Sequence, residues 1–356
     1  MKKMALLFFP ALISAFLMTA CDDGGGGGGK GSHAWTEANS TPFLYTRFDA
    51  EYSYETGRVY FLGGRCEDYP TETTVGYIWE YDPATGDYNS LPPVMTTPVS
   101  NYTIARLTDG NGREVFVIFG GRNNSGDQVP TVQCFYPDTL TVTSLPVGDN
   151  YTGMGSPGVA VVDNKAYVFG GVESVGHTAS ANTYIFDITA SSGSRWTAGP
   201  ALNLARGYIA AAAVDGIVYA MGGDIYDGSS LVAQTMVEKL DPTDASPAWN
   251  DVDAADLPFA CDETQAFGFD SDADYRYAGS IIVAGCGRWS SEYEYSLRYD
   301  AGSNTWYESF PDLNQARRNH AGAFIPEGEG AGRPGIWVWG GRQGSDYNLL
   351  GTPEYY

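Results

Sequence analysis

Six short apolar runs, each ending at a pair of small residues, recur along the chain. Five of them end in a glycine pair and the other ends in Gly285-Cys286. The first glycines of successive pairs are 57, 50, 52, 63 and 55 residues apart. Because the runs are β-rich and apolar at almost every position, they predict strands that are covered on both faces. The runs are residues 59–62, 115–119, 166–169, 217–221, 281–284 and 336–339.

The sequence between these runs repeats as well. After the glycine pair comes a loop, then a short segment with an aromatic and often an acidic residue, then a turn and a second aromatic residue. Examples of the first segment are residues 79–83, 184–187 and 297–300. The second aromatic residue is Trp196 in one unit and Trp306 in another. A repeating unit of this kind predicts one small sheet per repeat.

A unit of about 50 residues with this pattern resembles the Kelch repeat, in which each unit forms one four-stranded blade. The resemblance covers nearly all of the chain after the N-terminal segment. It implies an all-β fold, a six-bladed Kelch-type β-propeller over residues 34–356.

The C-terminal unit lacks its outermost strand. It offers strands near residues 320–324, 336–339 and 353–356, where the sequence stops. The segment 34–38, with Trp35, precedes the innermost strand of the first unit and has the aromatic residue of an outermost strand. We therefore expect this N-terminal strand to close the last blade, which would protect otherwise open edges.

The N-terminus is typical of an exported protein. Two lysines precede an apolar run over residues 5–18, and small residues stand directly before Cys21. Residues 18–21 resemble the bacterial lipobox, which implies a signal peptide at 1–20, a lipidated Cys21 and a location in the cell envelope. Residues 21–33 include six consecutive glycines and would form a flexible tether. The alternative is an ordinary secretory signal.

Charge and cysteines narrow the chemistry. The formal net charge of −23 argues against a surface that neutralises nucleic-acid phosphates. Four cysteines follow Cys21, and an even number in an exported protein permits disulfides. Cys261 and Cys286 fall at opposed ends of one predicted hairpin, so we expect them to pair. The pairing of Cys66 and Cys134 stays open.

Arginines gather in particular loops. In such a propeller, the loops from second to third strands and from one blade to the next emerge on one face around the channel. Seven of the fifteen arginines, and none of the five lysines, map to this loop face. Guanidinium groups suit carboxylates, so we expect a ligand-binding rim. The alternative is that they pair with acids such as Asp224. They are Arg65, Arg122, Arg206, Arg288, Arg317, Arg318 and Arg342.

No set of catalytic or metal-binding residues stands out. Galactose oxidase is similar in using a Kelch-like propeller, but its copper site needs two histidines, and only His320 has a matching context here. The acidic segment 270–274 lacks the later glycine and acid of a calcium loop. We therefore expect no cofactor and no metal.

The sequence favours a lipid-anchored binding or scaffolding module. Its partners would be the membrane, through the anchor, and a protein or glycan ligand, carboxylate-bearing ligands included, but not nucleic acid. One alternative is a sugar-acid epimerase that resembles the exported sialate mutarotases, and another is a structural envelope component.

Overall fold

The computed structural model describes residues 34–66, 73–173, 177–288, 292–328, 332–344 and 348–356. The predicted signal peptide, Cys21 and the tether therefore lie outside the described residues. Within these ranges the chain is β-strand, turn and loop, with one 3₁₀ turn at Val147–Asp149. The described residues contain no helix that is long and apolar enough to cross a membrane.

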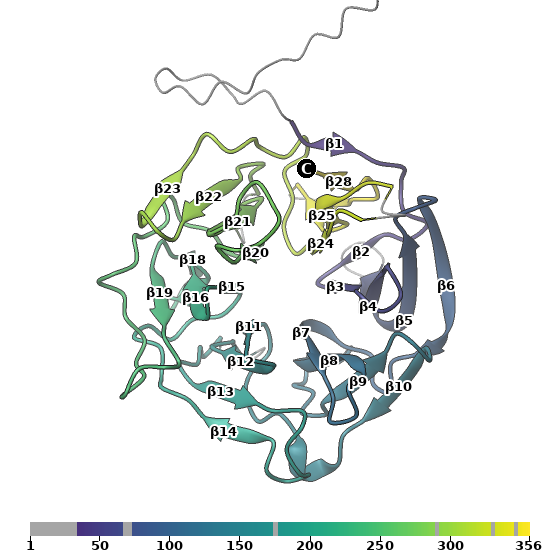
Figure 1. Cartoon of the computed structure of the whole chain (residues 1–356), viewed down its shortest axis with the longest axis horizontal. Helices are drawn as coiled ribbons and strands as arrows, with labels where there is room; N and C mark the ends of the chain where they lie inside the picture. Colours follow the sequence, from purple (N-terminus) through teal and green to yellow (C-terminus); the bar gives the residue numbers. More distant parts are fainter. Residues whose placement is uncertain (1–33, 67–72, 174–176, 289–291, 329–331, 345–347) are drawn as a thin grey trace, which may run out of the picture.

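Six blades, each built on one main sheet, surround a central axis (Figure 1), which confirms the predicted six-bladed propeller. We number the blades in chain order and give their strands from the axis outward. Blade 1 has β3 (Asp49–Ser53), β4 (Arg58–Cys66), β5 (Thr73–Asp82) and β6 (Asp87–Val94), and β2 (Tyr45–Thr46) also pairs with β4. Blade 2 has β7 (Ser100–Thr108), β8 (Glu114–Arg122), β9 (Gln133–Tyr136) and β10 (Thr141–Ser144). Blade 3 has β11 (Gly158–Val162), β12 (Lys165–Phe169), β13 (Thr183–Phe186) and β14 (Trp196–Ala198).

The later blades vary more. Blade 4 has β15 (Ala210–Val214), β16 (Ile217–Met221) and β19 (Val237–Leu240), with a side hairpin of β17 (Asp224–Tyr226) and β18 (Leu231–Ala233). Its outermost pairing is reduced to a bridge between Lys239 and Asn250. Blade 5 has β20 (Gln265–Phe269), β21 (Ser280–Ala284), β22 (Leu297–Asp300) and β23 (Thr305–Tyr307). Blade 6 has β24 (Ala321–Ile325), β25 (Gly335–Trp339), β28 (Glu354–Tyr355) and β1 (Thr36–Glu37), with a hairpin of β26 (Arg342–Gln343) and β27 (Asn348–Leu349).

The first and last strands of the described propeller meet in blade 6, as predicted. Strand β1 pairs antiparallel with β28, with Thr36 opposite Tyr355 (Figure 1). Trp35 is buried, and its indole Nε1 donates a hydrogen bond of 2.9 Å to the carbonyl oxygen of Pro311. Its ring also lies 5.7 Å from that of Tyr356. An outermost strand with a buried aromatic residue therefore closes the circle.

Each blade packs face to face with its neighbours. Six hydrophobic clusters lie in the described structure, one between each pair of adjacent blades. Between blades 6 and 1, for example, Trp337 and Trp339 stack with ring centroids 5.1 Å apart, and Trp339 meets Phe61 edge-on. The second strands are covered on both faces by these clusters, which explains their continuous apolar runs.

The glycine pairs mark the exit from each second strand. Gly222 has a φ of +57°, and a Cβ there would lie 2.2 Å from the carbonyl oxygen of Cys261. Any side chain would therefore strain the backbone and collide with the loop that enters the next blade.

Candidate functional site at the loop face and the central channel

Each blade contributes one residue in the left-handed region just before or at the start of its innermost strand. Their φ values lie between 51° and 57°. None of them is glycine, so the conformation costs about 1 kcal/mol or more at each position. We call this set the axial ring. It consists of Arg47, Asn101, Ser156, Tyr208, Glu263 and Asn319.

Backbone hydrogen bonds join neighbouring members of the axial ring. The N–H of Asn101 donates to the carbonyl of Arg47 at 3.0 Å, and that of Ser156 donates to Asn101 at 2.7 Å. The N–H of Arg47 in turn donates to Asn319 at 2.9 Å, which links blades 1 and 6. These bonds between blades offset the cost of the strained conformation.

Side chains of the axial ring meet across the axis. Arg47 Nη1 lies 3.3 Å from Asn101 Oδ1 and 3.4 Å from the hydroxyl of Tyr208. Blades 1 and 4 are opposite each other in a six-bladed propeller, so the contact between Arg47 and Tyr208 crosses the channel. The axial ring therefore closes one end of the channel.

Behind the axial ring lies a cavity of about 540 Å³. The innermost strands of all six blades form its wall. At the end remote from the axial ring, its lining includes the exposed residues Tyr54 and Asp270 and the partly exposed Arg106. The cavity thus opens on the face opposite to the loop face.

A second layer covers the axial ring on the loop-face side. Residues that follow the glycine pairs form backbone bridges to residues that precede the axial ring, as between Arg342 and Arg318 or between Asp224 and Gly207. Arg122, also in this layer, is buried, and its Nη2 donates to the carbonyl of Val172 at 2.6 Å. The structure therefore brings together Arg122, Arg318 and Arg342 at the closed end of the channel.

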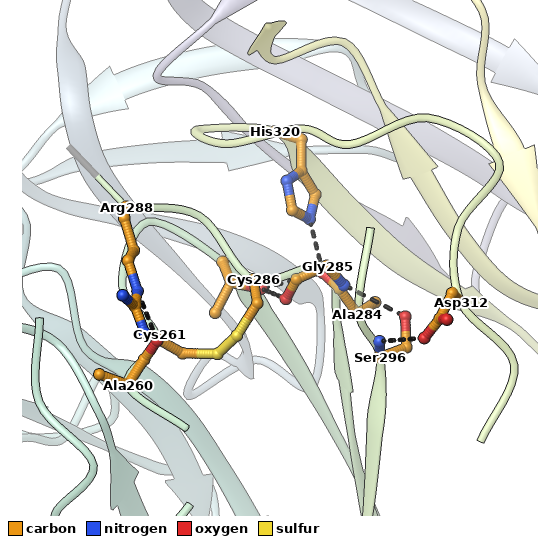
Figure 2. Close-up of a disulfide and its surroundings, with 10 residues drawn as sticks. Ala260, Cys261, Ala284, Gly285, Cys286, Arg288, Ser296, Asp312 and His320 are labelled. Atoms are coloured by element: carbon orange, nitrogen blue, oxygen red, sulfur yellow. Dashed lines mark hydrogen bonds between the residues drawn. A yellow bond between two sulfur atoms is a disulfide. The ribbon is translucent and has the colours of Figure 1, made fainter. Parts of the chain in front are cut away.

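Two of the predicted arginines are placed at the surface of the loop face. Arg65 and Arg288 are partly exposed. Arg65 Nε donates to the hydroxyl of Ser100 at 3.0 Å, and Arg288 Nε donates to the carbonyl of Ala260 at 3.0 Å (Figure 2). Both guanidinium groups are thus held in place while remaining in reach of solvent.

Arg206 and Arg317 depart from the predicted rim. Both side chains are 0% exposed and form ion pairs inside their blades, Arg206 with Glu238 at 2.9 Å and Arg317 with Glu354 at 2.7 Å. Their other donors bind backbone carbonyls, including those of Gly222 and Gly340. These two arginines do not face a ligand. Pairing with acids was the right alternative for them, although the acids lie in the third strands rather than in loops.

Buried acids and arginines create an unusual electrostatic cluster beside the axial ring. Burial raises the pKa of Asp224 to about 8, and the nearby Glu263 adds to the shift, while Arg122 and Arg47 oppose it. Burial and the same glutamate raise the pKa of Asp262 well above its usual value. Burial would also raise the pKa of Glu263, but Arg318, Arg47 and Arg342 hold it below its usual range. The Asp224 carboxyl therefore stays largely protonated at neutral pH.

Cys261 and Cys286 are joined by a disulfide across the loops that flank blade 5 (Figure 2). Their Cα atoms are 5.1 Å apart. Cys134 remains a buried thiol, and burial raises its pKa to about 12. Cys66 lies at the end of β4 and is partly exposed.

His320 and the acidic segment show no metal-binding arrangement. The His320 Nε2 atom lies 3.0 Å from the carbonyl oxygen of Ala284 (Figure 2). Residues 270–274 lie in the connection between β20 and β21, where Asp270 accepts a hydrogen bond from the N–H of Asp215. Over the described ranges, no group of three or more His, Cys, Asp or Glu side chains is placed to hold a metal ion.

Sequence reasoning missed the axial ring, Arg47 and Glu263 included. Its members share a backbone conformation and a position, but no side-chain type. Their spacing of 54, 55, 52, 55 and 56 residues was the available signal. The buried ion pairs of Arg206 and Arg317 had a clearer sequence signal, because the pattern Asn-x-Ala-Arg occurs at both 203–206 and 314–317.

Known proteins share this architecture. A family model described as the KLHDC2/KLHL20/DRC7 Kelch-repeats domain matches residues 52–260. The Kelch-like protein terF of Aspergillus terreus is 24% identical over 265 residues, which cover 71% of this chain and 52% of that protein. The chain thus spans about half the length of this relative. The solved structure of YjhT has a TM-score of 0.64 and 17% identity, with 88% of this chain and 95% of that one covered. That likeness concerns the fold alone.

Proposed function

Because the chain belongs to the Kelch-repeat family, we propose that it is a binding module that recognises a protein or glycan ligand through its loop face. The observation that carries this proposal is Asp224. It is 1% exposed, and neither carboxyl oxygen has a hydrogen-bond partner among the described residues. Buried polar groups are nearly always satisfied, so a buried carboxyl without a partner calls for a ligand or another explanation.

The surrounding charges support a carboxylate-bearing ligand. Arg65 and Arg288 hold their guanidinium groups at the surface of the same face, each fixed through Nε. A planar guanidinium can bind a carboxylate through two parallel hydrogen bonds. A ligand that combines a carboxylate with a hydroxyl or amide donor would contact these arginines and Asp224 together.

Lipid anchoring is part of the proposal. The lipobox-like residues 18–21 and the glycine-rich segment after them support a propeller tethered to a bacterial envelope membrane. Mass spectrometry of the mature N-terminus should find a lipidated Cys21, and Cys21→Ser should release the protein from membranes or block its processing. An unmodified N-terminus would refute the anchor.

Titration of the full-length protein with N-acetylneuraminate, a carboxylate-bearing sugar, tests the site by calorimetry. We expect binding that Arg65→Ala/Arg288→Ala weakens by about tenfold or more, because each charged hydrogen bond contributes roughly 1.5–3 kcal/mol. The matched control is Arg113→Ala, which removes a surface arginine paired with Asp138 in blade 2.

A pull-down from the native envelope tests for protein ligands. The baits are the wild type, the double variant Arg65→Ala/Arg288→Ala and the control Arg113→Ala. A partner retained by the control and lost by the double variant supports the loop face. If neither sugar nor envelope protein distinguishes the double variant from the control, the loop face is not the binding surface.

A sugar-acid epimerase is the second candidate. The raised pKa of Asp224, about 8, would let its carboxyl give a proton to a bound sugar near neutral pH. NMR of anomer exchange in N-acetylneuraminate decides between the two functions. A rate above the uncatalysed one that Asp224→Asn abolishes would favour the enzyme, and an unchanged rate would favour the binding module.

A further inference from the structure

The cavity behind the axial ring contains polar atoms that the protein leaves unsatisfied. Glu263 Oε1, Asn319 Nδ2 and His320 Nδ1 have no hydrogen-bond partner in the described part of the chain. The three residues are 6%, 7% and 1% exposed, and all three line the cavity. They come from blades 5 and 6, which are adjacent. Such a group of buried, unsatisfied atoms marks a place where something else supplies the hydrogen bonds.

The three atoms have mixed hydrogen-bonding character. Glu263 Oε1 is an acceptor, because Arg318 already donates to the other oxygen at 2.8 Å and the carboxylate is ionised. Asn319 Nδ2 can only donate. His320 Nε2 faces the carbonyl oxygen of Ala284, so it carries the proton and leaves Nδ1 as an acceptor. Burial lowers the pKa of His320 to about 3, which keeps this neutral form.

This mixture excludes the simplest charged ligands. A metal ion or an ammonium group would require acceptors throughout, and a phosphate or carboxylate would require donors throughout. A hydroxyl group donates one hydrogen bond and accepts others, so neighbouring hydroxyls can satisfy both kinds of atom at once. The chemistry at this end of the cavity therefore matches a ligand with several hydroxyl groups.

The walls of the cavity match the remaining surface of such a ligand. Small or apolar residues from several blades line the cavity, Val159, Ala211 and Gly322 among them. Its polar lining includes Asp49 and Gln265, whose side chains approach each other with Nε2 and Oδ1 3.5 Å apart. Sugars present both C–H faces and hydroxyl edges. A volume of about 540 Å³ falls in the range of small-molecule sites.

We propose that the channel cavity binds a neutral, polyhydroxylated ligand of monosaccharide size, which enters from the face opposite to the loop face and reaches Glu263, Asn319 and His320. This site is distinct from the loop face, because Arg65, Arg288 and Asp224 do not line the cavity.

The test uses the full-length protein in a detergent without a sugar headgroup. The neutral probes are D-glucose, D-galactose and myo-inositol, and the charged comparators are D-glucuronate and spermidine. Saturation-transfer NMR detects contact and calorimetry gives the affinity. Asn319→Asp replaces the donor by an acceptor in a residue type that tolerates the φ of 54°.

Asn304→Asp is the matched control. Asn304 has a φ of 51° and lies in the outer turn between β22 and β23, where its Oδ1 accepts hydrogen bonds from Ala255 and Tyr299 that an aspartate would keep. Ala211→Leu is a second variant, which fills the cavity without touching the three unsatisfied atoms.

We expect at least one neutral probe to bind more tightly than either charged comparator. Asn319→Asp should weaken that binding by about tenfold, Ala211→Leu should abolish it, and Asn304→Asp should leave it unchanged. The proposal is overturned if no neutral probe binds, if a charged comparator binds best, or if the control loses as much affinity as Asn319→Asp.

Discussion

The buried ion pair of blade 4 offers a sharp test of how the fold is stabilised. In Arg206→Met, a flexible apolar side chain of similar length would replace a guanidinium that is 0% exposed. Glu238 would keep its hydrogen bonds from the N–H groups of Asn203 and Leu204, at 2.7 and 3.2 Å. Its charge, however, would lose the cation that compensates it.

The expected cost follows from what Arg206 contacts. Its donors reach Glu238 Oε2 at 2.9 Å and the carbonyl oxygens of Gly222 and Ala220 at 2.7 and 3.1 Å. Removing one partner of a buried ion pair costs about 3–5 kcal/mol. The lost hydrogen bonds to the two carbonyls place the expected loss in the upper part of that range.

A second substitution separates charge from packing. Glu238→Gln keeps an acceptor for the two N–H groups but removes the charge. The double variant Arg206→Met/Glu238→Gln should therefore be more stable than Arg206→Met alone, although each change removes native interactions.

Urea unfolding at pH 7 measures these free energies. Arg113→Met is the control, because solvent screens its partly exposed pair with Asp138, which should therefore contribute little to stability. If Arg206→Met costs no more than this control, or if Glu238→Gln fails to restore stability, the ion pair is not what stabilises this part of the blade.

Three further predictions concern closure, the disulfide and pH. Trp35→Ala should lower the free energy of unfolding by about 3–5 kcal/mol, because it removes a buried indole beside the closing strand. An effect below about 1 kcal/mol in a urea titration would contradict the closure of blade 6 by this segment. Cys261→Ala/Cys286→Ala should cost about 3 kcal/mol, because the disulfide spans a sequence separation of 25 residues, and thiol labelling should find the pair oxidised in the wild type. The pKa of His320 is about 3 in the folded state and 6.5 for an ordinary histidine, so the unfolded chain binds more protons between these values and stability falls as pH drops below 6.5. Between pH 6.5 and 5 the wild type should lose about 2 kcal/mol more than His320→Gln does, and parallel pH profiles for the two proteins would refute the assignment.

The repeated apolar runs were enough to predict six blades, and the missing strand of the last unit was enough to predict that residues around Trp35 complete it. Both inferences rest on burial and strand count, because apolar runs indicate buried strands and the strands of each repeat can be counted in the sequence. The expected pairing of Cys261 with Cys286 rested on the same reasoning, because opposed ends of one hairpin must lie close together.

The site was harder to predict. The repeat pattern could not show which arginine side chains turn inward, since Glu238 and Glu354 lie more than 30 residues from their partners Arg206 and Arg317. The axial ring could not be predicted, because its members share a positive φ angle and not a residue type. Residues as different as Tyr208 and Glu263 adopt that angle, and only the assembled circle brings them together.

Closure by β1 has a consequence for the order of folding. The partners of residues 35–37 are Pro311 and residues 354–356, so these contacts span about the entire length of the propeller. Such contacts form slowly because a long loop must close first. While the chain emerges from a ribosome, β1 has no native strand to pair with until residues 354–355 appear. Blades 1 to 5 can therefore assemble progressively, whereas the sixth is completed in a single late step that requires both the first and the last strand of the propeller.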